Sequence, residues 1–387
     1  MDSQVLPPAA DAASTANPSL PPEPSGPSAP PPAPQPEPLS ARIFLGPQGL
    51  RAGWSVTLFG IFYYLVLVFG SMVAFFSDRS LLDFHFTPGK TAIAEAIPLF
   101  AILVAGYILA RLESRSFLDY YLRSTRPVSE FLSGAAAGFI GLSALVGMLA
   151  AGGWIHFGHA PAFGLALLRS CILWAVTFCF TGLFEEGSFR CYLQFTLSRG
   201  INFWWALAAQ AAICGITLAF DHGLGAYGVY AFVAIGLVPC FLLHLRRTSH
   251  SGFWQAAWVT SAGFAAYHTG NSGETTFGIF AVAAIGFVFC VSIRVTGSAW
   301  WAIGCHAAWD WAETFFYGTA NSGNVPHGSL FATSPAGKIL FSGGSVGPEG
   351  SLLILPAMLF LLILLFAYAR LRPASPAPAA PAHPLSS

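Results

Sequence analysis

Phe184-Glu185-Glu186-Gly187-Ser188-Phe189-Arg190 is the stretch that decides how this chain folds, because it sets two carboxylates and a guanidinium within an apolar run, residues 171–195. A charged side chain at membrane depth costs about 2.5–3.5 kcal/mol on insertion scales, so three of them require a reason. On a helix Glu186 and Arg190 lie four residues apart and can form an ion pair, whereas Glu185 points about 100° away from that pair. A structural ion pair therefore accounts for Glu186 and Arg190 but leaves Glu185 without a partner.

The composition indicates a polytopic helical membrane protein. Of the 387 residues, 55% are hydrophobic and only 9% are charged, whereas soluble domains usually carry about 25% charged residues. The apolar runs are continuous rather than alternating, which argues against a transmembrane β-barrel. The 17 basic and 17 acidic residues balance, and no basic patch suggests a nucleic-acid partner. The seven cysteines lie in apolar stretches without CxxC spacing, which indicates buried hydrophobic side chains rather than disulfides or a thiolate zinc site.

Apolar segments that approach or exceed the roughly 20 residues needed for a membrane-spanning helix recur along the chain. They are residues 54–76, 92–111, 129–152, 171–197, 203–220, 226–245, 253–269, 276–293, 298–317 and 351–369. Several are short, and the sixth contains Pro239, so the expected number of spans is eight to ten. The predicted fold class is all-α, a polytopic transmembrane helical bundle of about 8–10 spans with a disordered Pro-rich N-terminal tail.

The arginines orient these spans. With ten spans, most of them fall on one side, namely Arg42, Arg51, Arg111, Arg115, Arg123, Arg126, Arg199, Arg246, Arg247, Arg294, Arg370 and Arg372. The minority on the other side is Arg79, Lys90, Arg169 and Lys338. The positive-inside rule makes the first side cytoplasmic. The chain is therefore expected to be a multi-pass protein of the cell membrane with both termini in the cytoplasm.

Composition also divides the chain into segments. Residues 1–41 are rich in Pro and Ala, cannot bury a core, and are predicted to be disordered, as are residues 373–387. Residues 42–160 hold the N-terminal transmembrane helices and an amphipathic, interfacial elbow at 113–126. Residues 161–320 carry the polar side chains at depth, 321–350 form a Gly/Ser-rich outer loop without recognisable chemistry, and 351–372 hold the last span.

Two further polar motifs accompany the Glu-Glu pair. Phe264-Ala265-Ala266-Tyr267-His268 ends one predicted span, and His306-Ala307-Ala308-Trp309-Asp310 lies within another. His306 and Asp310 are one helical turn apart on one face. A lone histidine on an apolar face is usually a satisfied core residue, but each member of this set would need its own buried partner. We therefore expect one shared polar site.

These residue types are suited to hydrolysis of a carbonyl compound, most plausibly a peptide bond. No serine or cysteine has a matching His/Asp arrangement, so a covalent nucleophile is not indicated. A carboxylate with an imidazole can activate water, and a second imidazole with a carboxyl or amide group can stabilise an oxyanion. Alternatively, Glu185, His268, His306 and Asp310 could ligate a divalent metal, zinc among the candidates, that acidifies water. The sequence leaves the choice between no cofactor and a metal open.

Glu-Glu-x-x-x-Arg, Phe-x-x-x-His and His-x-x-x-Asp, in this order on separate spans, resemble the CPBP intramembrane protease family. This family includes the type II CAAX prenyl proteases and bacteriocin-processing, Abi-like proteins. The resemblance covers roughly residues 171–317 and includes the run Thr296-Gly297-Ser298-Ala299-Trp300-Trp301. It implies a protease whose partners are the lipid bilayer and a membrane-associated, prenylated or leader peptide or protein; it indicates no oligomeric state.

The resemblance also implies roles. Glu185 and His268 would activate water, His306 and Asp310 would lie on the oxyanion side, and Arg190 would brace the site with Glu186, which could also assist catalysis. Asp310 departs from the asparagine often found in this family, and a carboxylate cannot donate to an oxyanion unless it is protonated. Asp310 is therefore expected to be protonated, to orient His306, or to bind metal.

The middle motif has a rival in Phe220-Asp221-His222-Gly223. Leu218 rather than Phe precedes His222 by four residues, so His268 fits the pattern better, and residues 207–250 then form an insertion. His268 is expected towards the outer end of its span, so that span must be short, or broken at Gly270, for the site to assemble.

The sequence supports an intramembrane endopeptidase as the leading hypothesis. A proton-coupled membrane transporter that uses the same groups as a relay is the alternative. A non-catalytic membrane partner protein with the same fold is the third.

Overall fold

The computed structural model describes residues 39–46, 49–79, 86–158, 164–220, 223 and 225–371. His222 and the predicted tails, apart from residues 39–41, lie outside this range. The described chain begins with the short helix α1 (Leu39–Phe44), followed by β1 (Leu45–Gly46) and β2 (Gly49–Leu50), which pair antiparallel.

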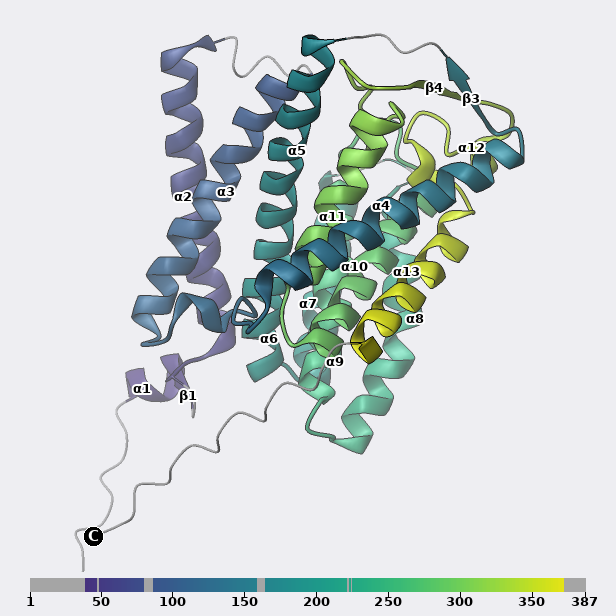
Figure 1. Cartoon of the computed structure of the whole chain (residues 1–387). Helices are drawn as coiled ribbons and strands as arrows, with labels where there is room; N and C mark the ends of the chain where they lie inside the picture. Colours follow the sequence, from purple (N-terminus) through teal and green to yellow (C-terminus); the bar gives the residue numbers. More distant parts are fainter. Residues whose placement is uncertain are drawn as a thin grey trace, which may run out of the picture. The chain divides into compact units, whose positions relative to one another are not determined.

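Each predicted span coincides with a helix (Figure 1). The helices are α2 (Ala52–Ser77), α3 (Pro88–Leu112), α4 (Pro127–Ala151), α5 (Leu165–Glu186) with α6 (Gln194–Gly200), α7 (Phe203–Phe220), α8 (Ala226–Arg246), α9 (Ser251–His268), α10 (Thr276–Thr296), α11 (Trp300–Trp311) and α13 (Ile354–Leu371). Among the described residues, eight of these segments are long and apolar enough to cross a membrane, with α5–α6 counted as one. The two that fall short are α9 and α11, which carry His268, His306 and Asp310. The predicted all-α, polytopic membrane fold is confirmed.

Two π-helices interrupt or extend these helices next to polar side chains. The first, η3 (Gly187–Leu193), joins α5 to α6 directly after Glu186, and the second, η4 (Ala312–Phe316), extends α11 shortly after Asp310. Such segments are rare and occur frequently at functional sites. Both are therefore landmarks for the site described below.

The connection between α11 and α13 is an ordered structure. It contains β4 (Ala332–Pro335), α12 (Ile339–Ser342) and the 3-10 turn η5 (Pro348–Gly350). β4 pairs antiparallel with β3 (Ile155–Gly158), with Ile155 opposite Pro335 (Figure 1). The indole of Trp174 on α5 also donates to the His327 carbonyl at 3.1 Å. These contacts fasten the loop to the connection after α4 and to α5.

Helix α4 crosses α11 obliquely and at very close range (Figure 1). A Cβ atom added at Gly134 or Gly138 would collide with the backbone carbonyl of Trp301 or Cys305, and one at Gly304 would collide with the Phe131 carbonyl. Small residues let helix backbones approach closely in membranes, where van der Waals packing drives association. This crossing fixes the position of α11, which carries His306 and Asp310.

The helix ends that carry most arginines gather on one face. The elbow after α3, which includes the 3-10 turn η2 (Phe117–Asp119), places Arg115 2.7 Å from Glu113. Glu113 also accepts a 2.6 Å hydrogen bond from Ser55 at the start of α2 and lies 3.6 Å from Arg199 at the end of α6. Elsewhere on this face, Arg294 of α10 reaches Nε2 of His250, just before α9, at 2.6 Å.

Candidate active site

The Glu-Glu pair lies at the end of α5, buried among α9, α10 and α11. Glu186 and Arg190 are fully inaccessible, and Glu185 is 7% exposed. Arg190 Nε lies 3.3 Å from Glu186 Oε2, and its guanidinium carbon lies 4.0 Å from the centre of the Phe264 ring. The predicted ion pair on one helix face is thus present, and an aromatic ring from α9 covers its positive member.

Glu186 also reaches across to α11. Its second oxygen, Oε1, lies 2.9 Å from Nδ1 of His306. Because a carboxylate can only accept, the Nδ1–H of His306 donates this bond, which fixes the orientation of the ring. The Phe289 ring stacks on the same imidazole with centroids 5.7 Å apart. Glu186 therefore holds both Arg190 and His306 in place.

Glu185 faces two imidazole rings. Its Oε2 lies 3.9 Å from Nε2 of His268 and 3.6 Å from Nε2 of His306. These distances exceed the usual 2.7–3.2 Å of a direct N–H···O hydrogen bond. At such separations a bridging water is the arrangement to consider. Glu185 is thus free of the ion pair and turned towards histidines from two other helices.

His268 is the last residue of α9, and Thr269 closes the helix with a hydrogen bond from its amide to the Ala266 carbonyl. Its position at the end of the helix brings His268 within 3.9 Å of Glu185. Its Nδ1 lies 2.8 Å from the Phe264 carbonyl oxygen. Because a carbonyl can only accept, Nδ1 carries the proton in the neutral ring, and Nε2 presents a lone pair towards Glu185.

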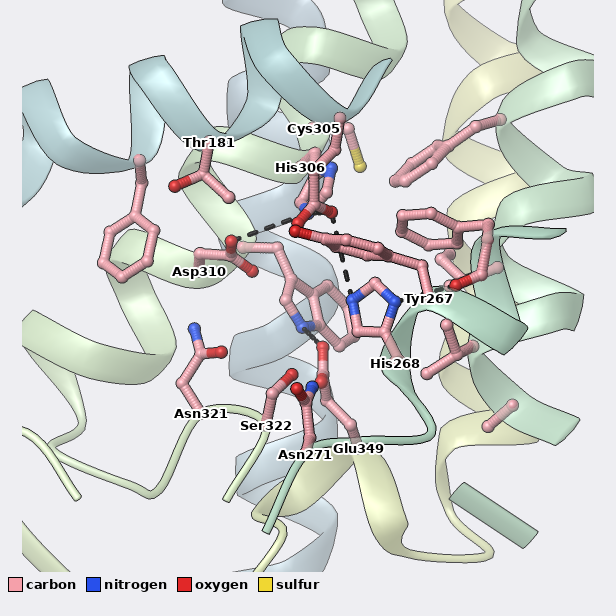
Figure 2. A pocket seen from close by; sticks show the side chains of 18 of the residues that line it. Thr181, Tyr267, His268, Asn271, Cys305, His306, Asp310, Asn321, Ser322 and Glu349 are labelled. Atoms are coloured by element: carbon pink, nitrogen blue, oxygen red, sulfur yellow. Dashed lines mark hydrogen bonds and ion pairs between the residues drawn. The ribbon is translucent and has the colours of Figure 1, made fainter. Parts of the chain in front are cut away.

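His306 and Asp310 project from α11 on one face, as their spacing predicts. His306 Nε2 lies 3.5 Å from Asp310 Oδ2. Figure 2 shows the rings of His268 and His306 and the carboxyl group of Asp310 turned towards one another. The structure thus brings together all six side chains singled out from the sequence, from α5, η3, α9 and α11.

Four of these side chains, Glu185, His268, His306 and Asp310, line a cavity of about 310 Å³. Asn271, which follows the Phe-x-x-x-His motif, also lines the cavity, and sequence reasoning missed several further polar lining residues, which are Glu95, Asn321, Ser322, Asn324 and Glu349. A carboxylate within the apolar span 92–111 was a signal that could have found Glu95. Residues 321–350, a loop in which the sequence shows no recognisable chemistry, contribute four of these lining side chains, and Figure 2 labels three of them, Asn321, Ser322 and Glu349.

The proposed metal ligands do not fit a single ion. Within the described part of the chain, the acidic and histidine side chains whose ligand atoms all lie within 4.8 Å of one another are Asp310, Glu313 and Glu349. Ligand atoms of a tetrahedral zinc bound at about 2.0–2.1 Å lie roughly 3.4 Å apart. Among the described residues, no three of Glu185, His268, His306 and Asp310 bring their ligand atoms within 4.8 Å of one another, and the His268–Glu185 separation is 3.9 Å. We therefore derive no step through a metal held by Glu185, His268, His306 and Asp310.

Two acidic groups in the loops beside the cavity titrate abnormally. Burial raises the pKa of Glu349 above its usual range, against the opposing effect of a 2.8 Å hydrogen bond from the Trp309 indole. Burial, with the nearby negative charge of Glu349, raises the pKa of Glu274 to about 8. Acidic groups are therefore concentrated where the α9–α10 loop meets η5, and their raised pKa values favour the protonated, neutral form.

The fold and this site define a polytopic helical membrane protein whose buried carboxylate–imidazole cluster lines a cavity. A narrower relationship comes from a protein-family model, type II CAAX prenyl endopeptidase Rce1-like, which matches residues 240–312. The matched segment contains His268, His306 and Asp310 and begins after Glu185. It confirms the resemblance over the segment that holds the second and third motifs. No curated protein and no solved structure matches the chain.

Proposed function

We propose that this protein is an intramembrane endopeptidase that hydrolyses a peptide bond of a membrane-associated peptide with a water activated by Glu185 and His268. The observation that carries this proposal is the position of the Glu185 carboxylate, within 4 Å of two imidazoles from separate helices at a buried cavity. The family match, whose name describes a prenyl endopeptidase, supports the same reaction class.

The pairing of Glu185 with His268 suits a nucleophilic water. With Nδ1 protonated, His268 presents a lone pair on Nε2, and the Glu185 carboxylate is also an acceptor 3.9 Å away. Two facing acceptors are both satisfied when a water donates one hydrogen to each. The oxygen lone pairs of that water then point away from both groups, towards a bound carbonyl carbon. As its oxygen bonds to that carbon, one proton passes to the Glu185–His268 pair.

His306 and Asp310 stand where the oxyanion would form. In a doubly protonated His306, Nδ1–H donates to Glu186 and Nε2–H can donate to the carbonyl oxygen as it gains negative charge. Asp310, 3.5 Å from Nε2, orients this ring. The carbon–nitrogen bond then breaks, and the proton held by Glu185–His268 passes to the leaving amine. Every proton is accounted for by the water and these side chains.

The cavity also limits the substrate. Its volume of about 310 Å³ is at the small end of the roughly 300–1,000 Å³ of ligand sites. It can enclose the residues around a scissile bond but not a folded domain. An extended segment, such as a prenylated C-terminal peptide or a leader peptide, is therefore the substrate class we propose.

This proposal is tested by cleavage of a quenched fluorescent peptide in proteoliposomes, with one farnesylated peptide and one leader-like peptide as probes. We expect Glu185→Gln and His268→Ala each to lower kcat at least 100-fold, since each removes one acceptor of the water. His250→Ala, which alters a histidine at the exposed contact with Arg294, is the control and should cleave normally.

Normal cleavage by folded Glu185→Gln and His268→Ala proteins would refute the catalytic assignment. Substrate-independent proton flux into the vesicles, abolished by the same substitutions, would favour the transporter instead. A cellular phenotype that Glu185→Gln leaves unchanged would favour a non-catalytic partner.

A further inference from the structure

A second cluster of acidic side chains lies beside the site, at the far end of α11. Asp310, Glu313 and Glu349 place one carboxylate oxygen each within 4.8 Å of the others. Glu313 belongs to the π-helix η4, and Glu349 to η5, so the cluster joins two segments that are separated by most of the loop between α11 and α13. The mechanism proposed above uses only Asp310 of the three.

Glu313 makes this cluster unusual. Its side chain is fully inaccessible, and neither of its carboxylate oxygens accepts a hydrogen bond from any described residue. Across the described ranges, no arginine or lysine forms an ion pair with it or with the other two carboxylates. Burial of an unpaired carboxylate is strongly unfavourable, and buried charges are normally paired or coordinate metals.

The backbone is built to bring η5 against Glu313. Gly347 has φ +119°, a conformation that favours glycine, and a Cβ there would lie 3.1 Å from Glu313 Oε1 and collide with the Ala320 carbonyl. The Glu313 carbonyl meanwhile accepts hydrogen bonds from both the amide and the hydroxyl of Thr319, each at 3.0 Å. The Glu313 side-chain oxygen Oε1 and the Ala320 main-chain carbonyl thus both lie beside Gly347.

We propose that Asp310, Glu313 and Glu349 form a binding site for a hard divalent cation of the Ca²⁺ class. All the ligands offered are oxygens, which hard cations prefer over softer metals such as zinc. Ca²⁺ binds oxygens at about 2.3–2.6 Å, so two oxygens on opposite sides of the ion lie up to about 5 Å apart. For Mg²⁺, with bonds of about 2.0–2.1 Å, the largest distance between two ligand oxygens is about 4.2 Å. Three carboxylate oxygens that lie within 4.8 Å of one another can all be accommodated around Ca²⁺.

The remaining coordination positions and the route of entry are supplied by the cavity. Asp310 and Glu349 line it, together with Asn321, whose amide group could offer a further oxygen. Water from the cavity can complete the six to eight ligands that Ca²⁺ requires. A cation here links η4 to η5 and so holds the loop against α11. This inference concerns binding and does not rest on the proposed protease activity.

The test uses the full-length protein in detergent, stripped with EDTA and returned to chelator-free buffer. Equilibrium binding of ⁴⁵Ca²⁺ and thermal unfolding followed by tryptophan fluorescence are measured without substrate. We expect one saturable Ca²⁺ site and a rise in Tm of at least about 3 °C at saturation, with a smaller effect of Mg²⁺. Glu313→Gln should weaken Ca²⁺ binding about ten-fold or more, whereas Asp119→Asn, which alters an acid of the exposed elbow after α3, should leave it unchanged.

If Glu313→Gln fails to fold, Glu349→Gln takes its place with the same expected loss of affinity. Absence of saturable Ca²⁺ binding to the wild-type protein would overturn the inference, as would wild-type affinity in a folded Glu313→Gln variant. If Glu313→Gln is more stable than the wild type and neither protein responds to cations, the inference is overturned. The carboxyl groups then share protons instead of binding a cation. Stabilisation by Zn²⁺ alone would overturn the assignment to a hard cation. Loss of peptide cleavage has no bearing on any of these readouts.

Discussion

Glu185 and Glu186 are adjacent in sequence, yet their carboxylates have different partners. Glu186 lies between Arg190, at 3.3 Å, and the Nδ1 of His306, at 2.9 Å, and is fully buried. Glu185 faces the Nε2 atoms of two histidines at longer distances. One carboxylate is thus committed to an ion pair and to orienting a ring, while its neighbour has room for a water.

The Glu186–Arg190 pair can be tested by removing its positive member. Arg190→Met leaves a buried carboxylate with His306 as its remaining charged partner, and this type of change costs about 3–5 kcal/mol of unfolding free energy. Denaturant titration of the purified protein measures the loss. The double variant Glu186→Gln/Arg190→Met removes both charges and should recover a substantial part of it.

Arg294→Met is the matched control, because Arg294 pairs with His250 at an exposed site. Such surface contacts are worth about 0–1 kcal/mol. Equal destabilisation by Arg190→Met and Arg294→Met would show that the buried pair contributes nothing particular to stability.

The sequence was sufficient for some of these residue-level contacts and not for others. The spacing of four predicts the Glu186–Arg190 pair and the shared face of His306 and Asp310. It does not predict the hydrogen bond from His306 to Glu186, because that bond depends on how α11 is placed against α5. Glu313 was missed because a single glutamate near the end of a predicted span resembles an ordinary helix terminus.

At the scale of elements, the crossing of α4 and α11 determines where His306 lies. Cys305, whose carbonyl blocks any Cβ at Gly138, is the residue directly before His306. The backbone of α4 therefore rests against the turn of α11 that carries this histidine. The sequence predicted both helices, but neither the crossing nor the π-helices η3 and η4, since these arise from tertiary packing rather than from local propensity.

Gly138→Ala tests this crossing with a single methyl group. The new Cβ would overlap the Cys305 carbonyl, which is backbone and cannot rotate away, so α4 must shift, at a cost of about 1–3 kcal/mol. We expect lower thermal stability and, because His306 moves with α11, reduced peptide cleavage. Gly147→Ala is the control, since among the described residues no atom beyond its own stretch of helix backbone lies within 4 Å of a Cβ at this position in α4.

In a helix, Gly→Ala otherwise stabilises by roughly 0.5–1 kcal/mol. Gly147→Ala should therefore unfold at the same temperature as the wild type or slightly higher. If Gly138→Ala behaves in the same way, the two helices are not as close as the structure has them.

For the molecule as a whole, the contacts between helix ends are consistent with ten crossings. The start of α2 and the ends of α3 and α6 meet at Glu113. The start of α11 adds to this face, where the Ala299 amide donates to the Tyr121 carbonyl at 2.8 Å. The β3–β4 pair joins the connections that ten alternating spans assign to the opposite face. These contacts agree with regular alternation, which requires α9 and α11 to cross as well, although neither is among the eight helices long and apolar enough to count as a span in the described chain.

Which face is cytoplasmic can be determined by labelling introduced cysteines. Thr125→Cys lies in the arginine-rich elbow and Ser334→Cys lies on β4, and both positions are exposed. The positive-inside rule predicts that a membrane-impermeant maleimide labels Ser334→Cys on intact cells and Thr125→Cys only after permeabilisation. The wild-type chain, whose seven cysteines are buried or partly buried, measures the background. The reverse pattern would invert the orientation. In the ten-span arrangement the chain crosses the membrane an odd number of times between residue 125 and residue 334, so the two positions lie on opposite sides. Labelling of both positions from the same side would therefore contradict this arrangement.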